Sequence, residues 1–430
     1  SLTLNLGLRW EYNSMLNDSV GNMTSIWPKL MATVPVPPTE PTTSGAGLVG
    51  YVVPKNTNPW YGTPPPGVLQ VNNNNSIEGH PPYTNFGPRV GFAWQPTSKA
   101  NLAIRGGFGM FYDRVQACYF VRAYQESPPY AVSLSYGPGN PYTLQNPFPD
   151  LSTGSYTPRW SNLACDPDGT NCSGGGSDLN SLFLNPDVDV PLTYQGSLSI
   201  QYEFLRNWVL DVAYVTSHGT RLMNSYRNVN LARLATPENP INGQVANTIA
   251  NIGLRVPHIG YQPTGLGGTY FDGRSSYHSL QTTVRKMFSH GLTLQASYTF
   301  SKNLTTLGAG DSSNSNDPLN MDQQYGPTGW NRPHRFILNY QYDLPLGRHQ
   351  GARGALLSGW SVSGITTIQT GVPLTFTESV RNSIFGASSS RAQMCAGATH
   401  DSIHTSGTVR ERLGGKSGGS GYINADAFCD

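Results

Sequence analysis

The stretch LTYQGSLSIQYEF, from Leu192 to Phe204, alternates between two kinds of residue along its whole length. Successive side chains of a β-strand point to opposite faces, so its even-numbered residues share an apolar face and its odd-numbered residues share a polar face. Strands of soluble domains usually have about 5 to 6 residues, whereas this stretch has thirteen. The pattern therefore predicts a long strand whose apolar face lies against either a protein core or a lipid bilayer.

The chain carries few charges for its 430 residues. Asp, Glu, Lys and Arg together make up 12% of it, against about 25% in typical soluble proteins. No window approaches about 18 consecutive apolar residues, which argues against a transmembrane helix; this test does not detect transmembrane β-strands, which are half polar. The net charge of +2 provides no basic field for nucleic acid, so nucleic acid is not an expected partner.

The same alternation recurs in eight other segments, which together with the first predict nine strands. These segments are LTLNLGLRWEY (2–12), RVGFAW (89–94), NLAIRGGFGMFY (101–112), WVLDVAYVT (208–216), YHSLQTTVRKMF (277–288), LTLQASYTF (292–300), HRFILNYQYD (334–343) and GWSVSGITTIQ (359–369). Short connections at 96–99, 205–207, 289–291 and 344–357 alternate with long ones at 13–85, 114–190, 218–275, 304–332 and 371–430. Such alternation is typical of a transmembrane barrel with tight periplasmic turns and long extracellular loops.

Charged residues avoid the apolar face of these strands. Those predicted to face the lumen of a barrel are Arg9, Glu11, Arg89, Arg105, Asp211, Arg285 and Arg335. Lys286 is the exception, and it lies near a strand end from which its side chain can reach the interface. We interpret the lumen-facing charges as a solvated inner wall, paired across strands or against a plug, with substrate selectivity as the functional alternative.

Large aromatic residues gather at both ends of the apolar face. At the short-turn end these are Trp94, Phe204, Trp208, Phe288, Tyr342 and Trp360, and at the long-loop end Trp10, Tyr12, Tyr112, Tyr194, Tyr214, Tyr298 and Phe336. Aromatic belts are a property of membrane-spanning proteins, because an amphipathic ring prefers the headgroup region. We therefore predict an all-β protein, an antiparallel transmembrane β-barrel. Nine is an odd number of strands, whereas bacterial single-chain barrels have an even number, so we expect the chain to form part of a larger barrel.

Four segments resemble the barrel portion of TonB-dependent outer-membrane receptors. They are NFGPRVGFAWQPTSKANLAIRGGFGMFYDR (85–114), SSYHSLQTTVRKMFSHGLTLQASYTFSKNL (275–304), NRPHRFILNYQYDLPLG (331–347) and SGWSVSGITTIQTGVPLTF (358–376). The similarity is greatest to the Oar-like group, which has an N-terminal carboxypeptidase-regulatory-like domain. The resemblance implies a barrel of about 22 strands around a plug, with energy relayed by the TonB coupling protein through a segment ahead of that plug. It implies that residues 1–430 are a partial barrel domain without plug, N-terminal domain or closing strands, and it assigns no ligand-binding residue.

Two loop segments contain residue types that bind metals. CDPDGTN, with Asp166, Asp168 and Asn171, resembles part of a calcium loop, but it lacks the bidentate Glu, and we interpret it as a polar turn. His400 and His404, close to Cys395, have a spacing that suits zinc on a helix, although the surrounding Gly and Ser favour a mobile loop. No metal or cofactor is expected from either segment.

The five cysteines allow two loop disulfides. Cys165 and Cys172 enclose a short polar loop that suits a local bridge, and Cys395 and Cys429 could close the last loop, which leaves Cys118 over. Sequence alone does not fix this pairing. The chain contains none of the common nucleophile, zinc-protease or phosphate-binding motifs, so an enzyme is not expected.

Three functional hypotheses follow. The first is a TonB-dependent receptor in the Gram-negative outer membrane that takes up a bulky nutrient, such as a glycan fragment, peptide or metal chelate, captured at the extracellular loops. The second is an outer-membrane adhesin or passive, porin-like barrel. The third is a secreted all-β binding protein, in which Leu198, Ile200, Leu210 and Val212 would pack on a second sheet.

Overall fold

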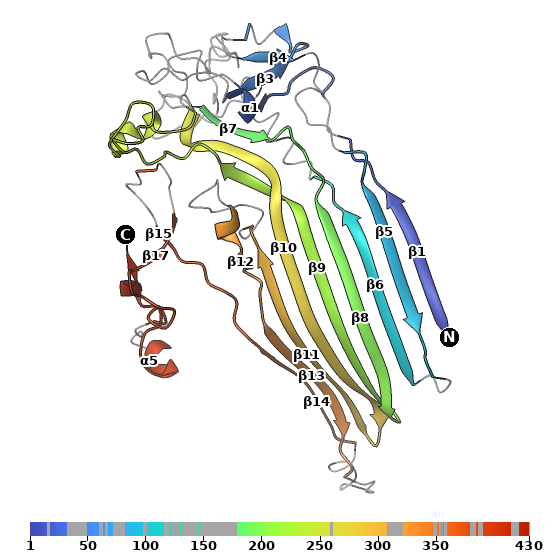
Figure 1. Ribbon diagram of the computed structural model, residues 1–430. Coiled ribbons are helices and arrows are strands. Elements are labelled where there is room, and N and C mark those ends of the chain that lie inside the picture. The colour runs from blue at the N-terminus through green and yellow to red at the C-terminus, as the bar shows by residue number, and fades with distance from the viewer. Residues whose placement is uncertain are drawn as a thin grey trace.

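The computed structural model describes most of the chain. The described residues are 1–14, 18–31, 50–59, 63–64, 68–71, 82–97, 101–115, 121, 130, 145, 179–258, 261–307, 321–346, 351, 354, 356, 359–378, 384–385, 390–413 and 421–429. Their main element is an antiparallel sheet of nine long strands that follow one another in chain order (Figure 1).

The nine strands are those that the alternation predicts, in number, order and direction. They are β1 (Leu2–Trp10), β5 (Phe86–Trp94), β6 (Leu102–Tyr112), β8 (Leu192–Leu205), β9 (Trp208–Asn228), β10 (Tyr261–Ser289), β11 (Leu292–Thr305), β13 (His334–Asp343) and β14 (Ser361–Gln369). Each is antiparallel to its neighbours in the sheet. Within the described part of the chain, the outer edges of β1 and β14 have no strand partner.

The connections between β8 and β9 and between β10 and β11 are tight turns at one end of the sheet. Between β10 and β11 the turn consists of His290 and Gly291, which have φ angles of 53° and 75°. Two consecutive positive φ angles suit the right-handed twist of a hairpin. A Cβ atom on Gly291 would lie 2.8 Å from the carbonyl oxygen of Asp343, so only glycine fits there. Asn207 supplies the left-handed residue of the β8–β9 turn, with a φ of 68°.

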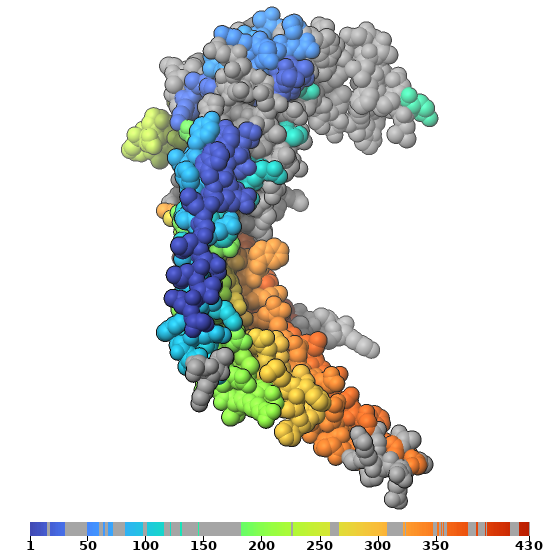
Figure 2. Space-filling model, turned by 90° about the vertical axis from the view of Figure 1, so that its right-hand side faces the viewer, coloured from blue at the N-terminus to red at the C-terminus, as the bar shows by residue number. Residues whose placement is uncertain are grey.

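The pairing register puts the even-numbered residues of all nine strands on one face of the sheet. Leu198, for example, lies directly between Gly106 of β6 and Tyr214 of β9. This face is apolar and uncovered: Leu198 and Ile200 remain 48% and 45% exposed, and Leu6 remains 80% exposed. The hypothesis of a soluble sandwich, with these side chains packed on a second sheet, is therefore wrong. Figure 2 shows the sheet as a curved wall, with β1 in dark blue.

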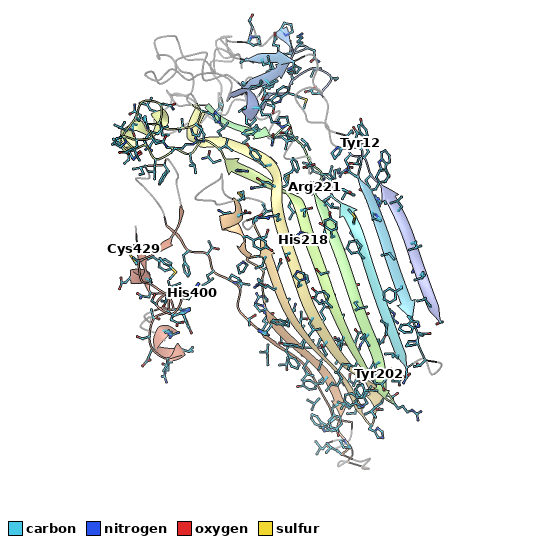
Figure 3. All side chains as sticks on the ribbon, in the orientation of Figure 1. Tyr12, Tyr202, His218, Arg221, His400 and Cys429 are labelled. Carbon is cyan, nitrogen blue, oxygen red and sulfur yellow. A yellow bond between two sulfur atoms is a disulfide. The ribbon has the colours of Figure 1, made fainter. Side chains whose placement is uncertain are left out.

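The apolar face has the height of a membrane. Tyr194 and Phe204, which belong to the loop-end and turn-end aromatic girdles, lie ten positions apart on β8. Ten residues of a strand tilted by about 40° cover about 25 Å, the height of the apolar band of outer-membrane barrels. Figure 3 shows Tyr12 and Tyr202 at opposite ends of the sheet.

Two lysines lie on the apolar face, where the sequence predicted only Lys286. The Nζ atom of Lys286 donates hydrogen bonds to the carbonyl oxygens of Ser289 at 2.7 Å and Leu292 at 3.0 Å, so the turn itself satisfies its charge. Lys302 is the second. The predicted strand stopped at Phe300, but β11 continues to Thr305 and pairs Lys302 with His278 on the apolar face.

Strands β9 and β10 extend much farther beyond the loop end than the alternation predicts. Their pairing reaches Asn228 and Gly267, although the register shifts around Tyr270 and Gly273. Such bulges bend a strand, and β10 curves over at its upper end in Figure 1. The prediction that 218–275 is one long loop is therefore wrong over much of its length.

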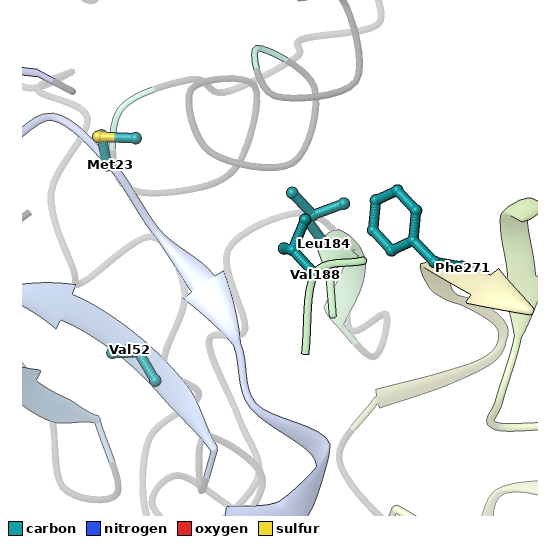
Figure 4. Close-up of a cluster of buried hydrophobic side chains, with 5 residues drawn as sticks. All are labelled: Met23, Val52, Leu184, Val188 and Phe271. Carbon is teal, nitrogen blue, oxygen red and sulfur yellow. The ribbon is translucent and has the colours of Figure 1, made fainter. Parts of the chain in front are cut away.

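The buried core lies beyond the loop-end girdle, where the outer part of β10 packs with the long connections. This outer assembly contains the small sheet of β2 (Ser25–Ile26), β3 (Tyr51–Pro54) and β4 (Leu69–Val71), the short helix α1 (Pro28–Met31), and β7 (Leu179–Leu184), which runs parallel to β10. One buried cluster of this outer assembly joins Met23, Val52, Leu184, Val188 and Phe271 (Figure 4). A second joins Ile26, Tyr51, Val53, Phe183 and Leu266.

The remaining elements are short. They are the 3₁₀-helices η5 (Ile249–Leu254), η6 (Met321–Gln324) and η8 (Ala425–Ala427), the helix α5 (Val409–Leu413), and the strands β12 (Gly326–Pro327), β15 (Thr377–Glu378), β16 (Ser390–Arg391), β17 (Gln393–Met394) and β18 (Phe428–Cys429). Among the residues described, no helix combines the length and apolarity needed to cross a membrane.

Candidate functional site: the polar face and the outer loops

The predicted lumen-facing charges share the odd-numbered face of the sheet. The pairing register places Arg9, Arg89, Arg105, Asp211, Arg285 and Arg335 there, and Glu11 directly follows β1. The structure does not gather them into one cluster, because they are spread over the sheet from β1 to β13. The polar face therefore presents a charged wall rather than a single compact site.

Several of these charges have partners on the same or a neighbouring strand. Arg9 pairs with Glu11 at 2.6 Å, and Arg285 approaches Asp211 of β9 at 3.9 Å. Arg105 donates a hydrogen bond to the side-chain oxygen of Gln201 at 2.8 Å. Exposed pairs of this kind contribute only about 0–1 kcal/mol each. Their arrangement fits a hydrated wall on which some of the charges are paired across or along the strands.

A shallow hollow of about 490 Å³ lies beside Arg89 on this face. Its polar lining includes Arg89, Gln195, Ser197 and Ser217. The guanidinium carbon of Arg89 lies 4.6 Å from the centre of the Phe111 ring, in a cation–π contact. The hollow thus combines an aromatic ring, a cation and hydroxyl or amide groups, which suits contact with a polar ligand or another protein segment.

Two glycines keep this hollow open. Gly107 and Gly109 form part of its lining, and a Cβ atom on Gly109 would lie 2.9 Å from the Phe111 ring. The sequence analysis did not identify Phe111 as a candidate. The sequence does mark Phe111 as unusual, since it is an aromatic residue at an odd-numbered, otherwise polar position of an alternating strand.

The outer part of β9 and β10 carries a second set of charges. Arg227 forms an ion pair with Asp272 and places its guanidinium 4.8 Å from the ring centre of Tyr270. Asn224 also donates to Asp272, at 3.2 Å. These contacts were missed because the segment was predicted to be a loop, and alternation carries no information about bulged strands.

A buried arginine holds the connection between β9 and β10 together. Arg255 is fully buried and donates to the carbonyl oxygens of Arg233 at 2.6 Å and Thr248 at 3.2 Å, and to that of Ile384. It also donates to the side-chain oxygen of Asn251 at 2.8 Å. Segments far apart in the sequence are therefore joined at one guanidinium group.

His258 gives the same connection a dependence on pH. Burial, together with the positive charge of Arg233, lowers the pKa of His258, so the folded connection favours the neutral ring. An opened connection binds the proton more readily, because its histidine has the ordinary pKa of about 6.5. The closed form is therefore fully stable above pH 6.5 and loses stability as the pH falls from there towards the lowered pKa. The equilibrium constant for opening rises by at most about tenfold for each pH unit in this range.

We expect hydrogen exchange of residues 229–258, corrected for intrinsic rates, to accelerate below pH 6.5 in the native protein. The variant His258→Gln should show a flat corrected profile over the same range. An identical pH profile in both proteins would contradict the assignment to His258.

Cys395 and Cys429, whose pairing the sequence left open, form a disulfide with their Cα atoms 4.9 Å apart. The bond joins β17 to β18, and Figure 3 labels Cys429 and His400 in this segment. Because the sulfur of Cys395 is bonded to Cys429, it is not a thiolate that could bind zinc with His400 and His404. Among the described residues, no three metal-ligating side chains come together. Cys118, the predicted Cys165–Cys172 bridge, and the segment with Asp166, Asp168 and Asn171 lie outside the described residues.

The comparison with protein families decides the class of this protein. The model of the outer membrane beta barrel domain matches residues 1–430. The chain belongs to this family. The barrel domain therefore resides in the outer membrane of a Gram-negative bacterium, and lipid is the environment of its apolar face. Members of this family are typically not enzymes.

Solved structures similar to the barrel domain include several outer-membrane proteins. The outer membrane transporter YddB from Escherichia coli is 11% identical, with a TM-score of 0.34, over 66% of this chain and 33% of that one. The siderophore receptor PirA from Pseudomonas aeruginosa is 10% identical, with a TM-score of 0.30, over 68% and 35%. The barrel domain thus spans about a third of the length of these proteins. No curated protein matches it.

Proposed function

We propose that the barrel domain is part of the wall of a TonB-dependent transporter that takes up a bulky nutrient. The observation that carries this proposal is the open sheet of nine adjacent strands, in which the outer edges of β1 and β14 have no partner among the described residues. Eight strands suffice to close a narrow barrel filled by side chains, whereas barrels of about 22 strands enclose a wide lumen that needs a plug. An open wall of this extent fits the wide class.

The polar wall and the outer assembly support the same proposal. The lumen-facing wall of a barrel that holds a plug needs charges and small residues that another protein segment can contact. The hollow beside Arg89 and Phe111 has the charge of Arg89 and the small residues Gly107 and Gly109. The outer assembly has buried cores of its own, so it presents a shaped surface to the cell exterior. Such loops on a rigid scaffold suit ligand capture. The substrate classes that we propose are glycan fragments, peptides and metal chelates.

The sequence resemblance to the Oar-like group supports the finer assignment. It places the plug, the coupling segment, the regulatory-like N-terminal domain and the remaining strands in other parts of the full-length protein, and it makes the TonB coupling protein a partner. Residues 1–430 are then a partial barrel domain. On this proposal the charges from Arg9 to Arg335 face its lumen as a solvated inner wall, paired across strands or against the plug.

Uptake assays test the proposal. Cells that produce the full-length protein should accumulate at least one of three labelled probes: an oligosaccharide, an oligopeptide or a ferric chelate. Accumulation should be lost when the inner-membrane energy coupler is deleted. Uptake that persists without the coupler would favour the passive barrel instead.

The partial-domain proposal makes a separate prediction. A bilayer does not tolerate unpaired strand edges, because no water satisfies their backbone groups. Expressed alone, residues 1–430 should therefore give no heat-modifiable band in detergent, whereas the full-length protein should give one. A heat-modifiable monomer formed by residues 1–430 would contradict the partial-wall assignment.

A further inference from the structure

A row of four cationic or protonatable side chains crosses the apolar face near its loop end. Its members are His218 of β9, His278 of β10, Lys302 of β11 and His334 of β13, and we call them the cationic row. They lie on four consecutive strands of the sheet, and all four side chains are exposed. Since this face contacts lipid, these residues point towards the bilayer rather than into the barrel.

The cationic row lies just outside the loop-end aromatic girdle. His218 lies four positions beyond Tyr214 on β9, and Lys302 lies four positions beyond Tyr298 on β11. On β13, which runs in the opposite direction, His334 lies two positions outside Phe336. With about 3.3 Å per residue and a strand tilt of about 40°, the row is about 5–10 Å farther out than the rings. Aromatic girdles mark the headgroup boundary, so the row reaches the polar headgroups themselves.

The cationic row is not balanced by acidic residues. The even-numbered positions in the paired segments 208–220, 276–286, 292–302 and 334–342 include no carboxylate. Asp272, six positions beyond His278 on β10, is already paired with Arg227, and Asp322 with Arg274. Within the described chain, Lys302 has no hydrogen-bond or ion-pair partner. Among the residues that the structure describes, its ammonium group therefore has no counter-ion.

Neighbouring tyrosines orient two of the histidines. The hydroxyl of Tyr214 lies 2.7 Å from Nδ1 of His278, and the hydroxyl of Tyr298 lies 2.7 Å from Nδ1 of His334. In both pairs the rings are nearly parallel, with interplanar angles of 24° and 27°. When the tyrosine donates to Nδ1, the proton of a neutral ring sits on Nε2. In that tautomer each ring presents an Nε2–H donor to a partner outside the protein.

We propose that the cationic row binds the phosphate groups of the phosphorylated glycolipid of the outer leaflet. An ammonium group that has no counter-ion within the described part of the chain, next to imidazole rings at headgroup depth, matches an anionic phosphate. The location on the lipid-facing side, outside the girdle, selects a lipid headgroup over a dissolved anion. This binding is independent of whether the barrel transports a nutrient.

The test uses the full-length protein in a zwitterionic detergent, with bisphosphorylated lipid A as the probe and native mass spectrometry as the readout. The triple variant His278→Gln/Lys302→Gln/His334→Gln should bind lipid A at least tenfold more weakly than the native protein. Arg335→Gln is the matched control, because it removes a positive charge from the opposite face of β13, one position from His334. It should bind lipid A like the native protein.

Two further arms identify the ligand. Lipid A without its phosphates should bind the native protein and the triple variant equally weakly, and excess inorganic phosphate should not displace intact lipid A. Heat-modifiability of each variant confirms that it folds. If the triple variant does not fold, Lys302→Gln alone is compared with Arg335→Gln. Lys302→Gln should then show the larger loss of affinity for lipid A. Three results would each overturn the proposal: equal affinity of the native protein and the triple variant for lipid A, binding of dephosphorylated lipid A to the native protein as tight as that of intact lipid A, or displacement of lipid A by inorganic phosphate.

Discussion

Leu198→Arg is expected to lower the free energy of unfolding from a bilayer by about 2–4 kcal/mol, the cost of an arginine at the midplane of a lipid-facing barrel surface. Leu198 lies between Tyr194 and Phe204 of the two girdles and is 48% exposed on the apolar face. No partner is available there for a guanidinium group, since its strand neighbours are Gly106 and Tyr214. Denaturant titration of the full-length protein in lipid vesicles measures the effect.

Ser197→Arg is the matched control. Ser197 directly precedes Leu198 but faces the polar side, where Gly107 and Val215 are its strand neighbours and leave room for a long side chain. Water can hydrate the new charge on that side, so the change in folding free energy should stay within about 0.5 kcal/mol. If the two variants were equally destabilised, lipid would not be the environment of the even-numbered face.

Arg255→Met is expected to open the connection between β9 and β10. Methionine replaces the apolar stem of the arginine but leaves the carbonyl oxygens of Arg233, Thr248 and Ile384 without their donor. Each unsatisfied buried carbonyl costs about 1–3 kcal/mol, so the local loss should be on the order of 3 kcal/mol. This corresponds to an acceleration of roughly 100-fold in the hydrogen exchange of residues 229–258.

Two comparisons make this prediction specific. Arg233→Met places the same residue at an exposed position of the same connection and should leave the exchange rates nearly unchanged. The heat-modifiable band of the full-length protein should persist in Arg255→Met, because the connection lies beyond the membrane-spanning sheet. Native exchange rates in Arg255→Met would show that the guanidinium group does not hold the connection closed.

The contrast between these predictions reflects two kinds of structure in one chain. The effect at Leu198 is visible in the sequence, since the residue belongs to a strict alternation. The effect at Arg255 is not, since nothing around it in the sequence distinguishes it from an exposed loop arginine. Only its contact with Ile384, 129 positions away, shows that it joins separate segments.

The sequence by itself determined the nine strands, their order, their two faces and the end at which the tight turns lie. It could do so because a bilayer imposes one rule on every span: side chains towards lipid are apolar, and side chains on the other face are polar. That rule is local and has a period of two residues, so it can be read without knowing which strands pair.

Tertiary structure decided where the strands end and what the long connections do. Beyond the membrane the alternation stops, and bulges around Tyr270 and Gly273 extend the pairing of β9 and β10 in a way that no period predicts. The extension of β11 that carries Lys302 onto the lipid-facing side follows from pairing with β10. The outer core joins Met23, Val52, Leu184 and Phe271 from widely separated segments, because burial in water depends on which distant surfaces meet, whereas exposure to lipid depends only on the direction in which a side chain points.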